Sequence, residues 1–354
     1  MPSLKADSIV GCLLGTAVGD AIGLACEGLS KRRQFRLYPH LNGYHFLFGK
    51  GMVSDDTEHT CMVAQALIVS SGDVPTFSKE LAWQMRFWLL GLPAGIGYTT
   101  LKAILKLWLG FKPDRSGIFS AGNGPAMRSA IIGICYGDNP QKLRELVRAS
   151  TRITHTDPKA EYGALAISVA SYLSNEQFNV SPQNYYHTLQ NLLGTEAPEF
   201  LELIQKACDC ANNQQTTASF AAQLGLNKGV SGYIYHTVPV VIQAWLRHQH
   251  NYRAGILEIV RCGGDTDTTA AILGAIIGAS VGKGGIPTDW LNSLWEWPRT
   301  VKWMELLGKR LADVSHLGIQ HRPLPLAGYG LFGRNLFFMI VVIVHGFRRL
   351  LPPY

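Results

Sequence analysis

The sequence lacks a concentrated block of basic residues. It has 32 Lys and Arg residues against 25 Asp and Glu residues, which gives a formal net charge of +7, and the basic residues are scattered over 354 positions. Proteins that bind nucleic acid gather such charge on one patch or stripe. We therefore expect no nucleic-acid partner, while the small positive surplus suits an anionic small substrate.

The sequence also lacks a pattern of paired cysteines. The seven cysteines are Cys12, Cys26, Cys61, Cys135, Cys208, Cys210 and Cys262. Their number is odd and no Cys-x-x-Cys occurs, which argues against a disulfide framework and against a zinc site. The first twenty residues contain an early acid and repeated glycines, which is not the pattern of a secretory signal. We therefore expect a reduced, cytoplasmic setting.

The apolar run near the C-terminus is short. Leu336–Val344 has nine apolar residues and lies between Arg334 and the pair Arg348 and Arg349. Nine helical residues extend about 14 Å, roughly half of a bilayer core. We therefore expect the apolar tail, residues 321–354, to pack on the rest of the chain, to make a dimer contact or to rest at a membrane interface rather than to span.

Alternating strand patterns are scarce, and the periodicity is helical nearly throughout. Apolar residues recur at three- and four-residue spacing in 78–91, 198–211 and 291–311, whereas 175–200 is polar and reads as a surface excursion. Gly, Pro and Asn turns separate the expected helices, and no low-complexity linker divides them. The sequence predicts an all-α fold, with a single compact multi-helix domain over residues 1–320.

Two of the expected helices carry glycines at every fourth position. They are Gly11, Gly15, Gly19 and Gly23 in the first helix, and Gly274, Gly278 and Gly282 in the second. A helix face without Cβ atoms allows another helix to approach closely. Such helices also occur in membranes, but Asp20 lies in the first and Asp265 and Asp267 open the second. We therefore expect the central helices of a soluble bundle, buried on all sides.

Two adjacent carboxylates, Asp55 and Asp56, follow Ser54 at the start of an expected helix. One explanation is helix capping, because a side-chain oxygen accepts orphan backbone N–H groups and negative charge suits this end of the helix dipole. Capping needs one such residue rather than three oxygens in a row. Taken alone, the motif leaves both a cap and a set of metal ligands open.

A second acidic cluster favours metal ligands. Asp265 and Asp267 flank one residue at another expected helix start, and Glu27 ends the first glycine-rich helix, two turns after Asp20. Carboxylates gathered in this way repel each other unless cations lie between them. Oxygen ligands without His or Cys select a hard cation, and two such ions share bridging carboxylates and activate a water. We therefore expect two Mg²⁺ or Mn²⁺ ions in a central cleft.

Five motifs resemble, in order, those of the ADP-ribosylglycohydrolase family. They are GTAVGDAIGLACEG, SDDT, GNGPAMR, THTDPKAEYGA and GGDTDTTAAILGAIIGA, and the resemblance spans residues 11–282. The family includes the hydrolase that removes ADP-ribose from dinitrogenase reductase and the related eukaryotic ADP-ribosylhydrolases. The resemblance implies an all-α domain with a dinuclear Mg²⁺ or Mn²⁺ centre in a central cleft.

The resemblance also implies roles for individual residues. The implied metal ligands are Glu27, Ser54, Asp55, Asp56, Asp265, Asp267 and Thr268. The implied catalytic residues are Asp55, Asp56 and Glu27, with Asp55 or Asp56 as the base, and Asp20 is expected to be a structural hydrogen-bond hub. The implied substrate contacts are Ser120, Gly122, Asn123, Gly124, Met127 and His155. Glycines there let backbone N–H groups approach a phosphate, although a plain turn before a helix explains Gly-Asn-Gly as well.

The implied activity is hydrolysis of an ADP-ribosylated protein. Water attacks the anomeric carbon of ADP-ribose, the modified side chain leaves, and free ADP-ribose is the product. One position departs from the family pattern, because arginine-specific members carry an Asp where Gly95 stands. An acid there would suit a guanidinium leaving group, so its absence puts arginine specificity in doubt.

Two alternatives to this activity stay open. The chain could be a non-catalytic ADP-ribose-binding or structural relative, or a dimetal phosphatase that acts on a nucleotide. The complete set of acids favours the hydrolase, because a non-catalytic relative is expected to lose at least one ligand. The matched motifs end by Gly282, so the tail is not expected to take part in the chemistry.

Overall fold

The computed structural model describes residues 2–352, and within that range the chain is all-α, with isolated bridges but no sheet. The first half contains α1 (Pro2–Gly23), η1 (Leu24–Cys26), α2 (Lys31–Leu37), α3 (Asp55–Ser70), α4 (Val74–Leu90), α5 (Tyr98–Trp108), α6 (Pro113–Ser116), α7 (Gly124–Met127), α8 (Ala130–Tyr136), α9 (Pro140–Arg152) and α10 (Pro158–Glu176). The second half contains α11 (Pro182–Leu193), α12 (Pro198–Asn212), α13 (Thr217–Gln223), α14 (Ile234–Arg247), α15 (Tyr252–Val260), α16 (Thr266–Val281), η2 (Lys283–Gly285), α17 (Thr288–Ser293), α18 (Val301–Leu317) and α19 (Gly328–Arg348). The predicted fold class is confirmed.

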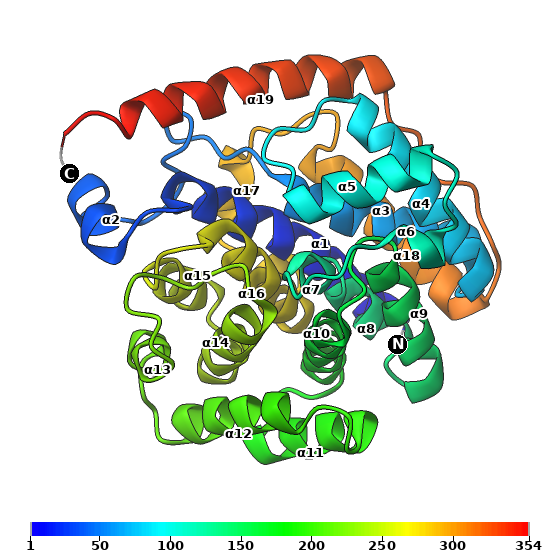
Figure 1. Ribbon diagram of the computed structural model, residues 1–354, viewed down its shortest axis with the longest axis horizontal. Coiled ribbons are helices and arrows are strands. Elements are labelled where there is room, and N and C mark those ends of the chain that lie inside the picture. The colour runs from blue at the N-terminus through cyan, green and yellow to red at the C-terminus, as the bar shows by residue number, and fades with distance from the viewer. Residues whose placement is uncertain (1, 353–354) are drawn as a thin grey trace.

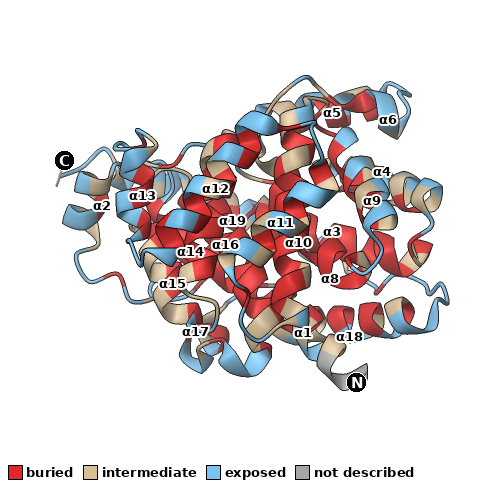
Figure 2. Ribbon diagram, turned by 90° about the horizontal axis from the view of Figure 1, so that it is seen from below, coloured by how far each residue is buried: buried red, intermediate tan, exposed pale blue. Residues whose placement is uncertain are grey.

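Helices α1 and α16 form the centre of the molecule and pack directly against each other (Figure 1). Their glycines meet, because a Cβ at Gly15 would lie 2.1 Å from the carbonyl oxygen of Gly274 and one at Gly278 would lie 2.2 Å from that of Gly11. Both helices are buried along nearly their whole described length (Figure 2). The predicted pair of central helices is confirmed, and their contact fixes where the acidic ends of both helices lie.

The other helices surround this pair in layers. Helices α3, α8, α10, α14, α15 and α18 contact α1 or α16, and α11 and α12 form an outer layer over α10 and α14 (Figure 1). The polar segment 175–200 is therefore more than a surface excursion, because it contains α11, which buries Tyr185, Leu189 and Leu193. The predominance of polar residues hid an amphipathic helix with one apolar face.

The single helix expected over 291–311 is wrong. The structure has two helices there, because α17 ends at Ser293 and α18 begins at Val301. Pro298 lies between them and has no N–H to donate to a helical carbonyl. The break matters for the site, because it contains Glu296 and Arg299, each only 4 % exposed.

The C-terminal helix α19 is longer than its apolar run and lies across one side of the molecule (Figure 1). It has 21 residues and is about 31 Å long, so the helix length of about 14 Å inferred from the nine-residue run is wrong. By length and composition, two helices could cross a membrane, Lys5–Cys26 and Gly328–Arg348, which is weak evidence because the first is the fully buried core helix. The second rests on the domain through buried Arg334 and Phe338.

Substituting Gly15 by Ala is expected to destabilise the protein by about 1–3 kcal/mol or more, because the new Cβ would overlap the backbone of α16. Gly346 of α19 is the matched control, since nothing lies within 4 Å of its Cβ position. Gly346→Ala should stabilise by about 0.5–1 kcal/mol through helix propensity. Urea unfolding followed by circular dichroism measures both, and equal effects would contradict the close crossing.

Candidate functional site

The segment after α1 and the starts of α3 and α16 meet at one cavity of about 220 Å³. Short elements from the middle of the chain complete its wall. The predicted site residues that line it are Glu27, Asp55, Gly122, Asn123, Gly124, Met127, His155, Asp265, Asp267 and Thr268. Residues up to 241 positions apart in the sequence are thus gathered around a space that fits a small polar ligand.

Two glycines in the left-handed region bring Glu27 to the start of α16. Gly263 has φ +72° and Gly264 has φ +84°, a conformation that strains any residue with a Cβ. The backbone of this turn exchanges hydrogen bonds with the loop after Glu27, because Gly28 N–H donates to the Gly264 carbonyl at 2.7 Å and Gly264 N–H donates to the Leu29 carbonyl at 3.3 Å. Glu27 is therefore held beside Asp265 by backbone contacts.

Asp20 organises the start of α3. Its carboxylate accepts hydrogen bonds from the N–H groups of Ser54 and Thr57 and, at 2.6 Å, from the Thr57 hydroxyl. The predicted structural role of Asp20 is thus what the structure shows. Burial raises the pKa of Asp20 to about 7, although the hydrogen bonds from Thr57 and Ser54 lower it. Asp20 lies behind the cavity and does not line it.

The hydroxyl of Ser54 caps α3 and fixes Asp56. It accepts from the Asp56 N–H at 3.3 Å and donates to Asp56 Oδ2 at 3.1 Å, and Thr268 donates to the same oxygen at 3.2 Å. Ser54 and Asp56 lie just behind the cavity wall, whereas Asp55 faces the cavity. The structure therefore shows Ser54 as a helix cap, and a metal-ligand role for Ser54, Asp55 and Asp56 stays a prediction.

Burial and mutual repulsion raise the pKa of these carboxyls. The pKa values of Asp55, Asp56 and Asp267 lie well above the ordinary value, first because the groups are buried and then because neighbouring carboxylates repel them. Burial and the charge of Asp265 likewise raise the pKa of Glu27. In a protein without bound cations, the charged form of these carboxyls is therefore disfavoured.

The unsatisfied atoms in this cluster suit a hard cation. Asp56 Oδ1 and Asp267 Oδ1 are buried and have no hydrogen-bond partner. Buried polar atoms without partners call for an ion or water, and a set made only of oxygens matches Mg²⁺ or Mn²⁺. Among residues 2–352, no three acidic, His or Cys side chains are already grouped closely enough to hold one ion, so the side chains would have to close around it.

The middle motif packs against the acidic cluster. Asn123 donates one amide hydrogen to Asp265 Oδ2 at 2.6 Å and another to the Thr237 hydroxyl at 3.0 Å. The motif is held in place by the segment 230–234, where Asn123 N–H donates to the Gly232 carbonyl. The sequence did not mark 230–234 as part of the site, because its Ser-Gly-Tyr composition reads as an ordinary turn.

The two glycines of Gly-Asn-Gly make room for His155. A Cβ at Gly122 would lie 2.9 Å from His155 Nε2, and one at Gly124 would lie 3.2 Å from His155 Cε1. His155 Nδ1 is 2.9 Å from the Thr154 hydroxyl, and burial together with the charge of Arg128 lowers the pKa of His155 to about 3. His155 is therefore a neutral imidazole that faces the cavity at physiological pH.

Two further predicted positions lie near α5 and the loop that precedes it. Ser120 does not line the cavity but lies next to it, where its hydroxyl accepts from Thr99 at 3.2 Å. Gly95 does line the cavity, with φ +81° and no atom within 4 Å of its Cβ position. The position at which the sequence departs from the family pattern is thus part of the cavity wall.

A buried ion network behind the cavity was not predicted. Glu58, one turn into α3, accepts hydrogen bonds at 2.5 Å from both Arg299 and Trp88 Nε1, and Arg334 of α19 lies 3.9 Å away. Although burial raises the pKa of Glu58, the two guanidinium groups lower it below its ordinary value. The partners are 241 and 276 positions distant in the sequence, so no local pattern could pair them.

The network reaches the Ser54-Asp55-Asp56 motif through the backbone. Arg334 donates to Glu296 at 2.7 Å and to the carbonyl of Val53, and the same Glu296 accepts from the Val53 N–H at 3.2 Å. Val53 directly precedes Ser54. Helix α19 therefore helps to fix the strand-like approach to α3, and the tail is part of the structure around the site.

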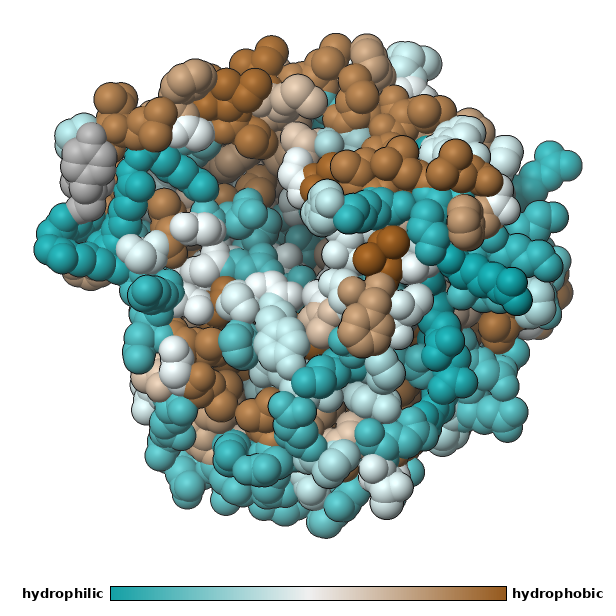
Figure 3. All heavy atoms as spheres, in the orientation of Figure 1, coloured by the Kyte–Doolittle hydropathy of each residue, from teal (hydrophilic) through white to brown (hydrophobic). Residues whose placement is uncertain are grey.

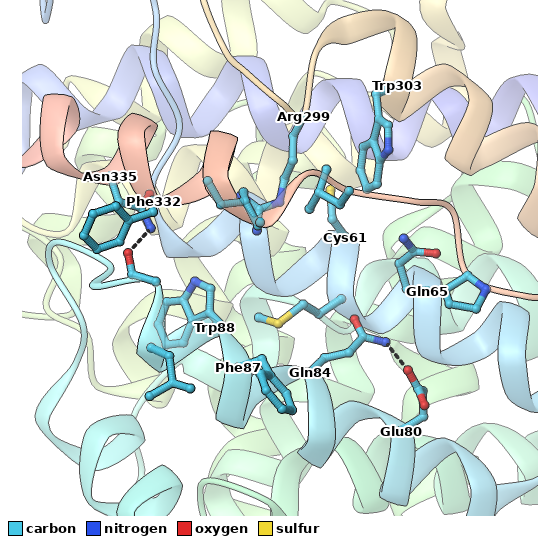
Figure 4. Close-up of a pocket in the computed structure, with 17 residues that line it drawn as sticks. Cys61, Gln65, Glu80, Gln84, Phe87, Trp88, Arg299, Trp303, Phe332 and Asn335 are labelled. Atoms are coloured by element: carbon cyan, nitrogen blue, oxygen red, sulfur yellow. Dashed lines mark hydrogen bonds between the residues drawn. The ribbon is translucent and has the colours of Figure 1, made fainter.

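A larger, mostly apolar cavity of about 470 Å³ lies between α3, α4, α18 and the start of α19 (Figure 4). Its polar side chains already have partners, because Gln84 donates to Glu80 and Asn335 donates to the Gly91 carbonyl (Figure 4). It presents none of the predicted acids. The smaller cavity, where charged and unsatisfied groups converge, is therefore the candidate functional site.

Comparison with known families decides which proteins share this arrangement. A family model described as ADP-ribosylglycohydrolase matches residues 1–319. The chain belongs to the ADP-ribosylglycohydrolase family. The match covers every helix that contributes to the cavity wall and ends before α19, so the Arg334 contacts lie outside the part that the chain shares with the family model.

The relatives of this chain are distant in sequence. An uncharacterised protein of Archaeoglobus fulgidus is 29% identical over 294 residues, covering 80% of this chain and 90% of the relative. ADP-ribosyl-[dinitrogen reductase] glycohydrolase of Rhodospirillum rubrum is 27% identical over 295 residues (81% and 90%), and ADP-ribosylhydrolase ARH3 of Gallus gallus is 26% identical over 340 residues (82% and 90%).

A solved structure has the same fold. A chain of an ADP-ribosylglycohydrolase-related protein complex superposes with a TM-score of 0.67 at 25% identity, and the alignment covers 88% of this chain and 99% of that chain. Family membership thus supports hydrolysis of ADP-ribose linkages in general.

Proposed function

We propose that the protein is a metal-dependent hydrolase that cleaves the glycosidic bond between ADP-ribose and a modified protein side chain. One observation carries the proposal: the acids Glu27, Asp55 and Asp267 line the same small cavity as Asn123 and His155. Their raised pKa values and the two unpartnered carboxylate oxygens support a cation site there. The family relationship supports ADP-ribose as the substrate group.

The residues available for two divalent cations are Glu27, Ser54, Asp55, Asp56, Asp265, Asp267 and Thr268. When bound, Mg²⁺ or Mn²⁺ would supply charge neutralisation and activation of a water. Asp55 lines the cavity and is the better candidate to accept a proton from the attacking water, whereas Asp56 is held behind the wall by Ser54 and Thr268. Water adds to the anomeric carbon, the glycosidic bond breaks and the side chain leaves with a proton.

The middle motif would position the ADP-ribose. Hydrogen bonds to Asp265 and Thr237 fix the amide of Asn123, so this side chain has one orientation in the cavity wall. Neutral His155 offers a hydrogen-bonding ring nitrogen, Nε2, which lies directly against Gly122. No acid stands at Gly95 to receive a guanidinium, which favours an oxygen-linked substrate over an arginine-linked one.

Incubation with peptides modified at Ser or at Arg tests the proposal. We expect release of ADP-ribose, detected by mass, only when Mg²⁺ or Mn²⁺ is present, and faster release from the Ser-linked peptide. Chelation with EDTA followed by re-addition of metal is the control. Tight binding of ADP-ribose without release from any peptide would support the non-catalytic alternative, and a phosphate-cleaved product would support the phosphatase.

A further inference from the structure

Helix α19 presents apolar side chains to solvent along its outer face. Exposed residues recur at intervals of three and four and are 42–88% exposed; they are Tyr329, Phe332, Leu336, Ile340, Ile343 and Phe347. The opposite face carries the buried contacts with the domain. A surface helix of a globular protein normally puts polar residues on its outer face, so the apolar outer face of α19 lacks a partner.

Neighbouring segments add to this apolar face. Phe48 is fully exposed at a turn where it has φ +46°, and it borders the helix beside Phe337 together with Trp295. The Trp295 ring lies 5.5 Å from that of Phe337. Leu90 and Leu92, both about half exposed, flank the Gly91 carbonyl that α19 binds. Figure 3 shows the resulting apolar band along the edge formed by α19.

The charge around this face is mostly positive, and the nearby acid at its basic end is Glu27, which interacts with Arg349. Residues 318–354 contain no Asp or Glu, and neither do residues 28–54. The fold brings the basic α2 to the end of α19, because Arg33 donates to the Arg349 carbonyl. Arg32 and Arg348 are exposed there. Basic residues that look scattered in the sequence thus gather at one end of the apolar face.

These features fit a lipid surface better than a second copy of the chain. An interfacial helix pairs an apolar face with basic residues, which anionic headgroups attract, and aromatic rings such as Trp295 suit the headgroup level. A second copy would bring the same basic residues and no acidic partner from this face. A spanning orientation would require the helix to leave the domain and to carry Arg334 out of its contacts with Glu296.

We propose that the outer face of α19, with Phe48 and Trp295, seats the protein on the surface of an anionic bilayer, with the helix parallel to the membrane plane. Arg334 and Asn335 keep the inner face attached to the domain. Apolar burial supplies the attachment, and the basic end next to α2 selects anionic lipid.

Vesicle flotation of the full chain tests this. Phosphatidylcholine vesicles with phosphatidylglycerol should bind the protein, and those without it should bind more weakly. Ile340→Asn with Phe347→Ser should lower partitioning roughly tenfold or more, because two apolar side chains no longer enter the interface. Arg32→Gln and Arg348→Gln should each lower it about fivefold. Phe178→Ser, at an equally exposed Phe between α10 and α11, is the control and should change nothing.

An environment-sensitive label shows whether this face, rather than another part of the protein, enters the membrane interface. All seven cysteines are buried, so Phe48→Cys or Ile343→Cys provides one reactive site for an environment-sensitive label. The label should shift to an apolar environment with anionic vesicles, whereas one at Phe178→Cys should not. Absence of vesicle binding overturns the proposal. So does a dimer in light scattering that Ile340→Asn with Phe347→Ser dissociates, because a second copy would then cover this face.

Discussion

Asp267→Asn is expected to lower the release of ADP-ribose by more than about a hundredfold while leaving the helical fold intact. Loss of an outer-shell partner alone costs about 10- to 100-fold in metal affinity or activity, and a direct ligand should cost more. The fold should persist because Asp267 is repelled by Glu27, Asp265, Asp56 and Asp20, and the substitution removes that repulsion. The metal-free variant should therefore be at least as stable as the metal-free parent protein.

The stability comparison separates a ligand from a structural residue. Mg²⁺ or Mn²⁺ should raise the melting temperature of the parent protein through binding to the folded state, and this increase should be reduced or lost in Asp267→Asn. Asp209→Asn, at an exposed aspartate of α12, is the matched control and should keep both the activity and the metal-dependent increase. Full activity with an unchanged metal response in Asp267→Asn would remove this residue from the cation site.

Arg334→Met is expected to destabilise the protein by about 3–5 kcal/mol, because it leaves the carboxylate of Glu296 buried without its partner. Removal of the chain after residue 325 should have at least this effect, since it also exposes the surface under α19. We expect this truncation to lower turnover as well, because Arg334 holds the backbone of Val53 next to Ser54 and Asp55.

A double variant tests whether the unpaired charge causes the loss. Glu296→Gln with Arg334→Met removes both charges and should recover much of the stability that Arg334→Met loses. Arg322→Met changes an exposed arginine of the same tail and serves as the control. Urea unfolding measures all of them. If Arg322→Met and Arg334→Met have equal effects, the buried network does not contribute as described.

Patterns of neighbouring residues in the sequence predicted the central helix pair and the acidic cluster. The fourfold glycine spacing predicted the crossing of α1 and α16, and the acids at helix ends predicted the cluster that the structure brings together. Asp20 was expected to be a hydrogen-bond hub and is one. Whether cations occupy the cluster stays a prediction.

Other features depend on contacts between distant segments, which a single sequence does not reveal. Glu58 looks like an ordinary first-turn acid, and only the folded chain pairs it with Arg299 and Arg334. The prediction of one helix over 291–311 is wrong because the apolar spacing continues across Pro298, whereas the helical backbone is interrupted there. The length of α19 was underestimated because Gly333, Arg334 and Asn335 precede the apolar run without breaking the helix.

The close crossing of α1 and α16 also has a consequence for how the chain is synthesised. Gly11 emerges from the ribosome long before its contact Gly278, on the order of ten seconds to a minute earlier at about 5–20 residues per second. During that time the apolar segment Lys5–Cys26 lacks its main partner. Its burial against α16 must wait until most of the chain has been translated, so a chaperone that binds early apolar segments would protect this protein more than one whose first helix finds its main partner nearby in the sequence.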